Sequence, residues 1–182
     1  MEQGNSRGKS VAIFEWILFA MLGALMVCSK IIMEAIPNVH LLGTLTMVYT
    51  LVFRTKALLP IGVFVAITGL YAGFHAWWVP YLYIWTVLWG VTMLLPRKMP
   101  RWLARIVYPA ICCFHGLAFG ILYAPAQALL YGFDFEQTVA WVLTGLPWDL
   151  IHGIGNLVTG LLILPLSELL KRLVQRQLSH SV

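Results

Sequence analysis

Charged side chains are scarce in this sequence, and their scarcity excludes an ordinary soluble domain. Asp, Glu, Lys and Arg make up 10% of the 182 residues, hydrophobic residues make up 60%, and the mean hydropathy is +0.84. A soluble domain carries about 25% charged residues. We therefore expect an all-α integral membrane protein, with a single domain over residues 1–182 and short cytoplasmic tails at residues 1–10 and 171–182.

The sequence also lacks the patterns that mark many enzymes and metalloproteins. It has no GxxxxGK[ST] phosphate-binding loop and no HExxH pair, so we expect no ATP hydrolysis by the chain, no catalytic residues, no cofactor and no metal site. The three cysteines, Cys28, Cys112 and Cys113, lie in apolar segments without a CxxC spacing. Such cysteines usually pack as small hydrophobic residues.

Prolines and charges divide the sequence into six apolar segments, which predict six transmembrane helices. The expected spans are Val11–Ile36, His40–Phe53, Ala57–Phe74, Tyr81–Leu95, Trp102–Ala124 and Trp148–Leu170. The second and fourth are shorter than the roughly 20 residues that cross a bilayer core. Residues 125–145 form the longest connection, in which Glu136–Leu143 is a candidate for a short helix at or dipping into the outer surface. Pro147 is expected in the first turn of the sixth span, where its missing N–H is harmless.

Basic residues fall on alternate connections, which predicts the orientation of the chain. Eleven of the twelve Lys and Arg residues lie in the tails or beside the connections between spans 2 and 3 and spans 4 and 5, and only Lys30 departs from this pattern. By the positive-inside rule, both termini are cytoplasmic. The same residues account for the pI of about 9.3 without a nucleic-acid partner.

Three polar side chains lie on one face of the sixth span. Asp149, His152 and Asn156 occupy positions i, i+3 and i+7, which share a helix face. Ionisable groups within a membrane need a wet cavity, a partner or a ligand. We expect these three in the outer third of the span, within about 15 Å of its start, facing a ligand; hydrogen bonding between helices is the structural alternative. His115 is expected to pack and to bond across helices.

Several motifs occur in an order that resembles one family of transport proteins. They are the Ala20-xxx-Ala24 motif, Ile36-Pro37-Asn38, Tyr49–Pro60, Trp77–Tyr83 and Leu146–Asn156. Over residues 20–171, these motifs and the predicted topology are similar to the substrate-binding S-components of energy-coupling factor (ECF) transporters. These six-helix proteins import vitamins and other micronutrients in bacteria and archaea.

The resemblance implies a vitamin-like ligand at the outer face of a bacterial cytoplasmic membrane. Cobalamin, pantothenate, a pyrimidine or pyridine vitamin precursor and folate all remain open as ligands. The resemblance also implies a membrane-embedded coupling subunit, docked on Ala20, Gly23 and Ala24, and two cytoplasmic ATPase subunits. The implied ligand-binding residues are Asn38, His40, His75, Trp78, Tyr81, Trp85, Tyr123, Asp149, His152 and Asn156.

Two other functions are weighed against this one. An intramembrane enzyme would use Asp149 and His152 as an acid–base pair, but no serine or cysteine nucleophile stands in a recognisable arrangement. A channel or standalone secondary carrier is disfavoured because the sequence has no inverted repeat and no line of polar residues across the full bilayer.

Overall fold

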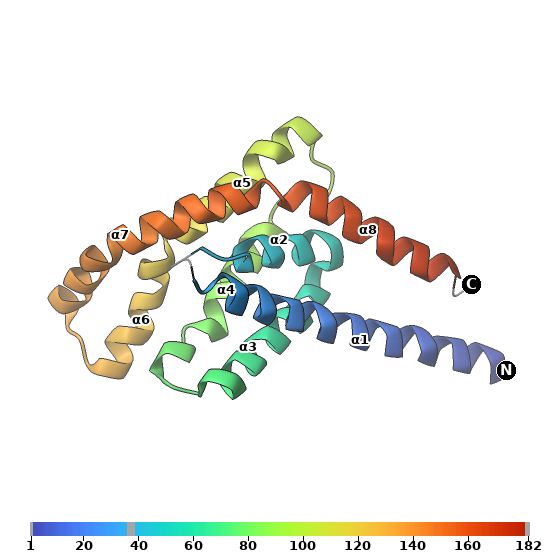
Figure 1. Ribbon diagram of the computed structural model, residues 1–182, viewed down its shortest axis with the longest axis horizontal. Coiled ribbons are helices and arrows are strands. Elements are labelled where there is room, and N and C mark those ends of the chain that lie inside the picture. Colours follow the sequence, from blue (N-terminus) through green and yellow to red (C-terminus); the bar gives the residue numbers. More distant parts are fainter. Residues whose placement is uncertain (1, 36–38, 181–182) are drawn as a thin grey trace.

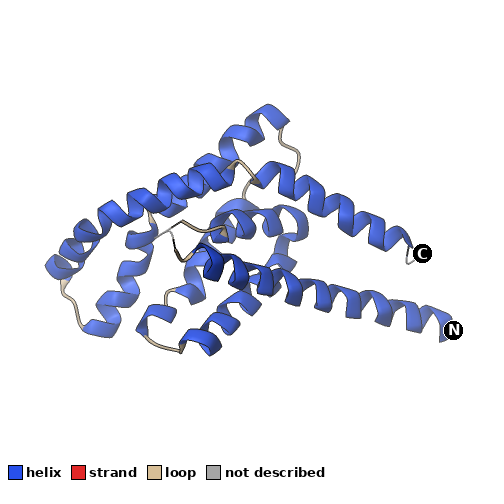
Figure 2. Ribbon diagram, in the orientation of Figure 1, coloured by secondary structure: helices blue, strands red, loops and turns tan. Residues whose placement is uncertain are grey.

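Within the described residues, 2–35 and 39–180, every regular element of the computed structural model is helical (Figures 1 and 2). The helices are α1 (Glu2–Met33), α2 (Leu42–Phe53), α3 (Leu58–Ala72), α4 (Tyr81–Met93), α5 (Arg101–Leu117), α6 (Phe119–Tyr131), α7 (Phe135–Gly160) and α8 (Ile163–His180), with 3₁₀ turns at Arg54–Ala57 and Ala76–Trp78. The all-α fold class is therefore confirmed for this part of the chain. The predicted tails are helical as well, because residues 2–10 belong to α1 and residues 171–180 to α8.

Among the described residues, three helical stretches are long and apolar enough to cross a membrane, and a bent pair raises the number to four if it forms one span. The three are Ile13–Met33, Leu42–Ala72 and Arg101–Tyr131, and the bent pair is α7 with α8, which meet at an angle of 48°. Both α2, with 12 residues, and α4, with 13, are shorter than the roughly 20 residues of a full span. Six separate spans therefore stay a prediction.

The turn between α2 and α3 is held by contacts to two other helices. Arg54 ends α2 with a φ of 57°, which is uncommon for a residue other than glycine. Its guanidinium donates to the Met93 carbonyl at 2.8 Å, and its own carbonyl accepts from the Trp89 indole at 3.1 Å. Lys56 forms an ion pair of 2.7 Å with Glu15 of α1. This turn therefore lies beside α1 and the end of α4.

The last predicted span begins 13 residues earlier than expected. Asp134 accepts a hydrogen bond from the Gln137 backbone N–H at 2.8 Å, and the Gln137 side chain accepts from the Asp134 N–H at 3.0 Å. This capping box starts α7 at Phe135. Pro147 therefore lies inside α7 and not in its first turn. Asp149 is about 21 Å from the start of α7 at 1.5 Å per residue, so the polar face lies in the second half of this helix and not within about 15 Å of its start.

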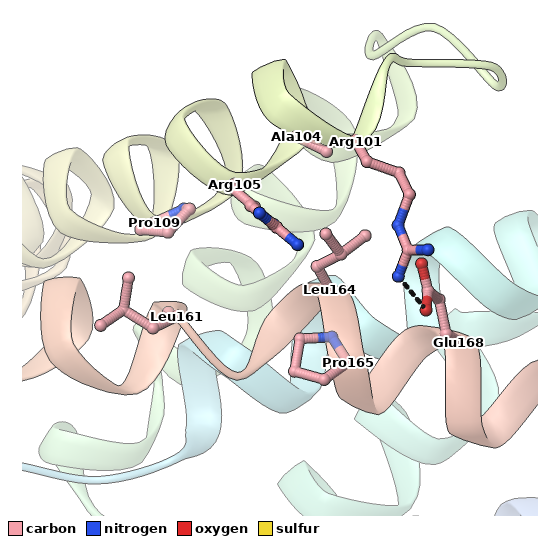
Figure 3. A pocket seen from close by; sticks show the side chains of 9 residues that line it. Arg101, Ala104, Arg105, Pro109, Leu161, Leu164, Pro165 and Glu168 are labelled. Carbon is pink, nitrogen blue, oxygen red and sulfur yellow. Dashed lines mark hydrogen bonds and ion pairs between the residues drawn. The ribbon is translucent and has the colours of Figure 1, made fainter.

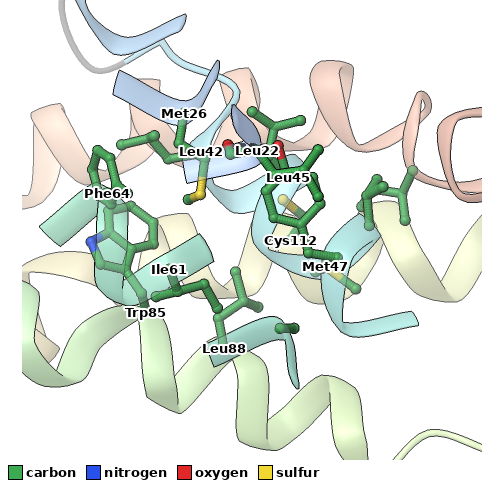
Figure 4. Close-up of a cluster of buried hydrophobic side chains, with 14 of the residues drawn as sticks. Leu22, Met26, Leu42, Leu45, Met47, Ile61, Phe64, Trp85, Leu88 and Cys112 are labelled. Atoms are coloured by element: carbon green, nitrogen blue, oxygen red, sulfur yellow. Dashed lines mark hydrogen bonds between the residues drawn. The ribbon is translucent and has the colours of Figure 1, made fainter. Parts of the chain in front are cut away.

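The apolar core surrounds α2, whose residues Leu42 to Thr50 are all buried. A helix that is apolar on every side is typical of a protein interior. Figure 4 shows Leu42, Leu45 and Met47 of α2 packed with side chains from α1, α3, α4 and α5. Trp85 of α4 is the largest fully buried side chain of this core, and it also reaches the polar groups described below.

The backbones of α5 and α7 approach closely. A Cβ atom built on Gly116 would lie 2.9 Å from the Gly153 Cα, and one built on Gly160 would lie 2.8 Å from the Pro109 Cα. Small residues permit such approach between membrane helices. The approach places the polar face of α7 directly beside α5.

Candidate functional site

Five aromatic rings from five segments meet beside the core. They include three histidines, which are rare in the interior of a protein unless they have partners. The rings belong to His40 in the loop before α2, Trp85 in α4, His115 in α5, Phe119 in α6 and His152 in α7. We call these five residues the histidine–tryptophan cluster.

Contacts between ring edges and ring faces hold the cluster together. The His152 ring centroid lies 4.7 Å from that of His40 and 4.6 Å from that of Phe119. The Trp85 centroid lies 6.1 Å from that of His40, 5.8 Å from that of His115 and 6.2 Å from that of Phe119. These separations fall in the range in which aromatic rings attract one another. The cluster thus joins the loop before α2 with α4, α5, α6 and α7.

Five polar atoms at the cluster are buried and make no hydrogen bond within the described part of the chain. They are His40 Nδ1, Trp85 Nε1, His115 Nδ1, His152 Nε2 and Asn156 Oδ1. A buried polar atom without a partner costs about 1–3 kcal/mol, and native proteins leave few of them. Five unpartnered polar atoms in one place could be satisfied by a ligand with complementary polar groups.

Two polar side chains at the cluster, His115 and Asn156, are tied to the backbone of neighbouring helices. His115 Nε2 lies 3.2 Å from the Ile84 carbonyl, and Asn156 Nδ2 donates to the Cys112 carbonyl at 3.1 Å. Each side chain is therefore held in place through one atom and leaves its other polar atom available. Fixed polar groups of this kind orient ligands in binding sites.

The His40 side chain of the cluster is uncharged at neutral pH. Burial lowers the pKa of His40, which lies in the loop outside the membrane-spanning helices, to about 4. Its imidazole is therefore uncharged at pH 7 and offers one donor and one acceptor. The described residues contain no group of three or more His, Cys, Asp or Glu side chains placed to share a metal ion.

Asp149 lies outside the cluster, and its carboxylate accepts a hydrogen bond from the backbone. Both of its carboxylate oxygens accept from the backbone N–H of Gly120 at 3.1 Å. Gly120 is the second residue of α6. Ala118 separates α6 from α5 and interrupts the helix there. The first N–H groups of a helix lack intrahelical partners and carry a partial positive charge. Asp149 of α7 therefore caps the N-terminus of α6, which is the hydrogen bond between helices given above as the structural alternative.

We expect Asp149→Ala to lower the free energy of unfolding by about 2 kcal/mol, because a charged hydrogen bond is worth about 1.5–3 kcal/mol. Thermal unfolding of the detergent-solubilised protein measures this loss. Asp149→Asn keeps one acceptor and should lose less. Replacement of the exposed Asp134 by alanine, which removes an N-cap at the start of α7, is a matched control that should cost about 1 kcal/mol. Equal melting temperatures for Asp149→Ala and the wild type would contradict the capping role.

Two of the predicted tyrosines flank the cluster. The Tyr81 ring centroid lies 5.7 Å from that of Trp85, and the Tyr123 centroid lies 5.9 Å from that of Phe119. The Tyr123 hydroxyl donates to the Trp77 carbonyl at 2.6 Å, which ties α6 to the connection between α3 and α4. Tyr81 and Tyr123 therefore extend the aromatic surface beyond the five rings.

Two other predicted site residues belong to the α3–α4 connection and lie apart from the cluster. The Trp78 indole donates to the Val65 carbonyl at 2.8 Å and packs against Phe74. His75 is exposed, and its ring covers Gly73, which has a φ of 89° that suits glycine. These side chains hold the connection against α3. Asn38 lies outside the described residues.

Phe119 is a member of the cluster that the sequence did not single out. His115 was expected to pack and to bond across helices, which its contact with the Ile84 carbonyl confirms, but its place in the cluster was not predicted. Both bear on His152, because Phe119 contacts it directly and His115 contacts Phe119, with ring centroids 6.4 Å apart. Their i, i+4 spacing is a usable signal, since such residues share a helix face.

The predicted docking residues of α1 divide between two faces. Ala20 is exposed and Ala24 is half-buried, whereas Gly23 is buried. A Cβ on Gly23 would lie 2.8 Å from the Pro60 carbonyl oxygen of α3. Gly23 therefore serves packing of α1 on α3, and the face open to a partner contains Ala20 and Ala24.

Comparison of the chain with models of known protein families, with curated proteins and with solved structures finds no match.

Proposed function

We propose that this chain is the substrate-binding S-component of an ECF-type importer in a bacterial cytoplasmic membrane. It captures a vitamin-like molecule at the outer face and delivers it inward with a membrane-embedded coupling subunit and two cytoplasmic ATPase subunits. The observation that carries the proposal is the set of five unpartnered polar atoms in the histidine–tryptophan cluster and at Asn156. High-affinity pockets typically combine aromatic walls with a few fixed polar groups.

The proposed topology has six membrane segments with both termini in the cytoplasm. The segments are α1, α2, α3, α4, α5 with α6, and α7 with α8. In support, the first turns of α1 and the last turns of α8 lie at the same end of the molecule (Figure 1). The basic α2–α3 turn lies beside the end of α4, as expected if both face the cytoplasm.

The cluster favours a flat, uncharged, nitrogen-containing ring as the ligand. Trp85 Nε1 can only donate a hydrogen bond and Asn156 Oδ1 can only accept one, whereas the histidines can do either. A heterocycle that carries both donors and acceptors would satisfy these atoms, and its faces would pack against the rings of Phe119 and Trp85. Asp149 supplies no free charge for a cationic ligand because it caps α6.

The experiment that tests this function is mass spectrometry of small molecules that co-purify with the detergent-solubilised protein. We expect a heterocyclic vitamin or precursor at near-equal stoichiometry. His152→Ala and Asn156→Leu should each weaken binding about tenfold or more, because each removes a hydrogen bond of about 1–3 kcal/mol.

His75→Ala is the matched control, because this exposed histidine lies on the outer connection between α3 and α4 and away from the cluster. It should bind the ligand as the wild type does. Loss of ligand in His75→Ala together with retention in His152→Ala would contradict the cluster as the binding site.

A further inference from the structure

A cleft of about 370 Å³ opens at the far end of α5 from the cluster, where α7 breaks and α8 begins. Arg101 and Arg105 of α5 form one wall, as Figure 3 shows. The opposite wall consists of Leu161, Leu164 and Pro165, and Glu168 lies beside Arg101. The cleft thus combines a cationic wall with an apolar wall.

The two arginines differ in what they contact. Arg101 forms an ion pair of 2.8 Å with Glu168, which the dashed line in Figure 3 marks. Arg105 points between α5 and α8 (Figure 3) and makes no hydrogen bond or ion pair within the described residues. Since the two lie at i and i+4, their side chains share one face of α5. An anion in the cleft would therefore meet one free guanidinium and one that is neutralised in part.

Apolar side chains continue from the cleft along the outside of the bundle. Trp102 and Ile106, which follow the two arginines in α5, are 66% and 62% exposed, and Leu161 at the helix break is 62% exposed. Trp102 and Ile106 belong to the stretch Arg101–Tyr131, which is long and apolar enough to cross a membrane. Leu161 lies at the break between α7 and α8, which together form the bent candidate span. The cationic wall therefore lies where this apolar surface gives way to the basic residues of the α4–α5 connection.

We propose that this cleft binds the phosphate headgroup of an anionic phospholipid. The Arg105 guanidinium contacts the phosphate oxygens, because its planar donors match phosphate in two-point contacts. Arg101 adds charge from the same face, and an acyl chain lies along Leu161 and Ile106. Basic clefts between membrane helices at the cytoplasmic side suit anionic headgroups. The proposal requires membrane insertion with the basic connections at the cytoplasmic side, and it is independent of the transported ligand.

Lipid titration of the purified full chain, followed by native mass spectrometry, tests this site. We expect phosphatidylglycerol to bind more tightly than phosphatidylcholine. Arg105→Gln should weaken phosphatidylglycerol binding about fivefold, as expected for one basic residue at an anionic membrane surface. Arg105→Lys should lose less, because it keeps the charge. Glu168→Gln should tighten binding, because it removes the negative charge beside Arg101.

The matched control is Lys98→Gln, which removes a nearby exposed basic residue that does not line the cleft. It should leave the preference for phosphatidylglycerol unchanged. Equal losses in Lys98→Gln and Arg105→Gln would overturn the proposal, since the preference would then reflect overall surface charge. Inorganic phosphate that binds with the same Arg105 dependence, without a preference for lipid, would assign the cleft to a soluble phosphate and also overturn it.

Discussion

Gly116→Ala is expected to destabilise the protein by about 3 kcal/mol, although it adds a single methyl group. The new Cβ would lie 2.9 Å from the backbone N and Cα of Gly153 and 2.8 Å from Asn156 Nδ2. Backbone atoms cannot rotate away, so α5 and α7 must separate, and overpacking of this kind costs about 1–3 kcal/mol or more. Separation would also pull Asn156 from the Cys112 carbonyl and disturb the proposed ligand site.

Thermal unfolding in detergent, followed by the loss of helical circular dichroism, measures this effect. Gly145→Ala is the matched control, because a Cβ there meets no atom within 4 Å and the residue belongs to α7 itself. It should be neutral or should raise stability by up to about 1 kcal/mol through helix propensity. If Gly116→Ala melts at the same temperature as Gly145→Ala, the close contact between α5 and α7 is contradicted.

Ala20→Trp is expected to abolish uptake of the ligand by cells while the purified protein keeps its affinity. Ala20 is exposed on α1, and α1 contributes no ring to the histidine–tryptophan cluster. An indole at this position would prevent close approach of a coupling subunit, because docking between small residues depends on short distances between helices. Uptake of labelled ligand by cells and equilibrium binding to the purified protein give the two measurements.

Leu70→Trp on α3 is the control for Ala20→Trp, because Leu70 is 74% exposed and lies on another helix. It should support uptake at the wild-type level. Parallel loss of binding and uptake in Ala20→Trp would show damage to the fold and count against a docking face on α1. Normal uptake by Ala20→Trp would remove this residue from the docking face.

The largest difference between prediction and structure concerns Asp149. Its position in an apolar segment correctly indicated that the side chain needs a partner, but the partner is the N-terminus of another helix. That terminus exists because the helix is interrupted at Ala118, in a stretch of apolar residues and glycines without proline or charge. Sequence patterns recognise breaks that carry such signals, so this one and its need for a cap were not predictable.

The start of α7, in contrast, carries a signal that the sequence contains. The residues Asp134-Phe-Glu-Gln137 form a capping box in the structure, and the same pattern is legible in the sequence. Pro147 instead favoured a helix that begins near Trp148, so the start of the last span was placed 13 residues too late. Local hydrogen bonding of the capping residues decides the boundary here.

The sequence by itself determined the helical class, the apolar segments and the identity of several polar groups that enter them. Scarcity of charge and a 3.6-residue spacing are local properties, so they can be read without knowing which helices touch. Only the tertiary structure decided that His40, Trp85, His115, Phe119 and His152 meet while Asp149 and His75 do not. Close approach through Gly116 and Gly153 and the interruption at Ala118 produce that arrangement, because contacts between distant segments depend on packing that no local pattern encodes.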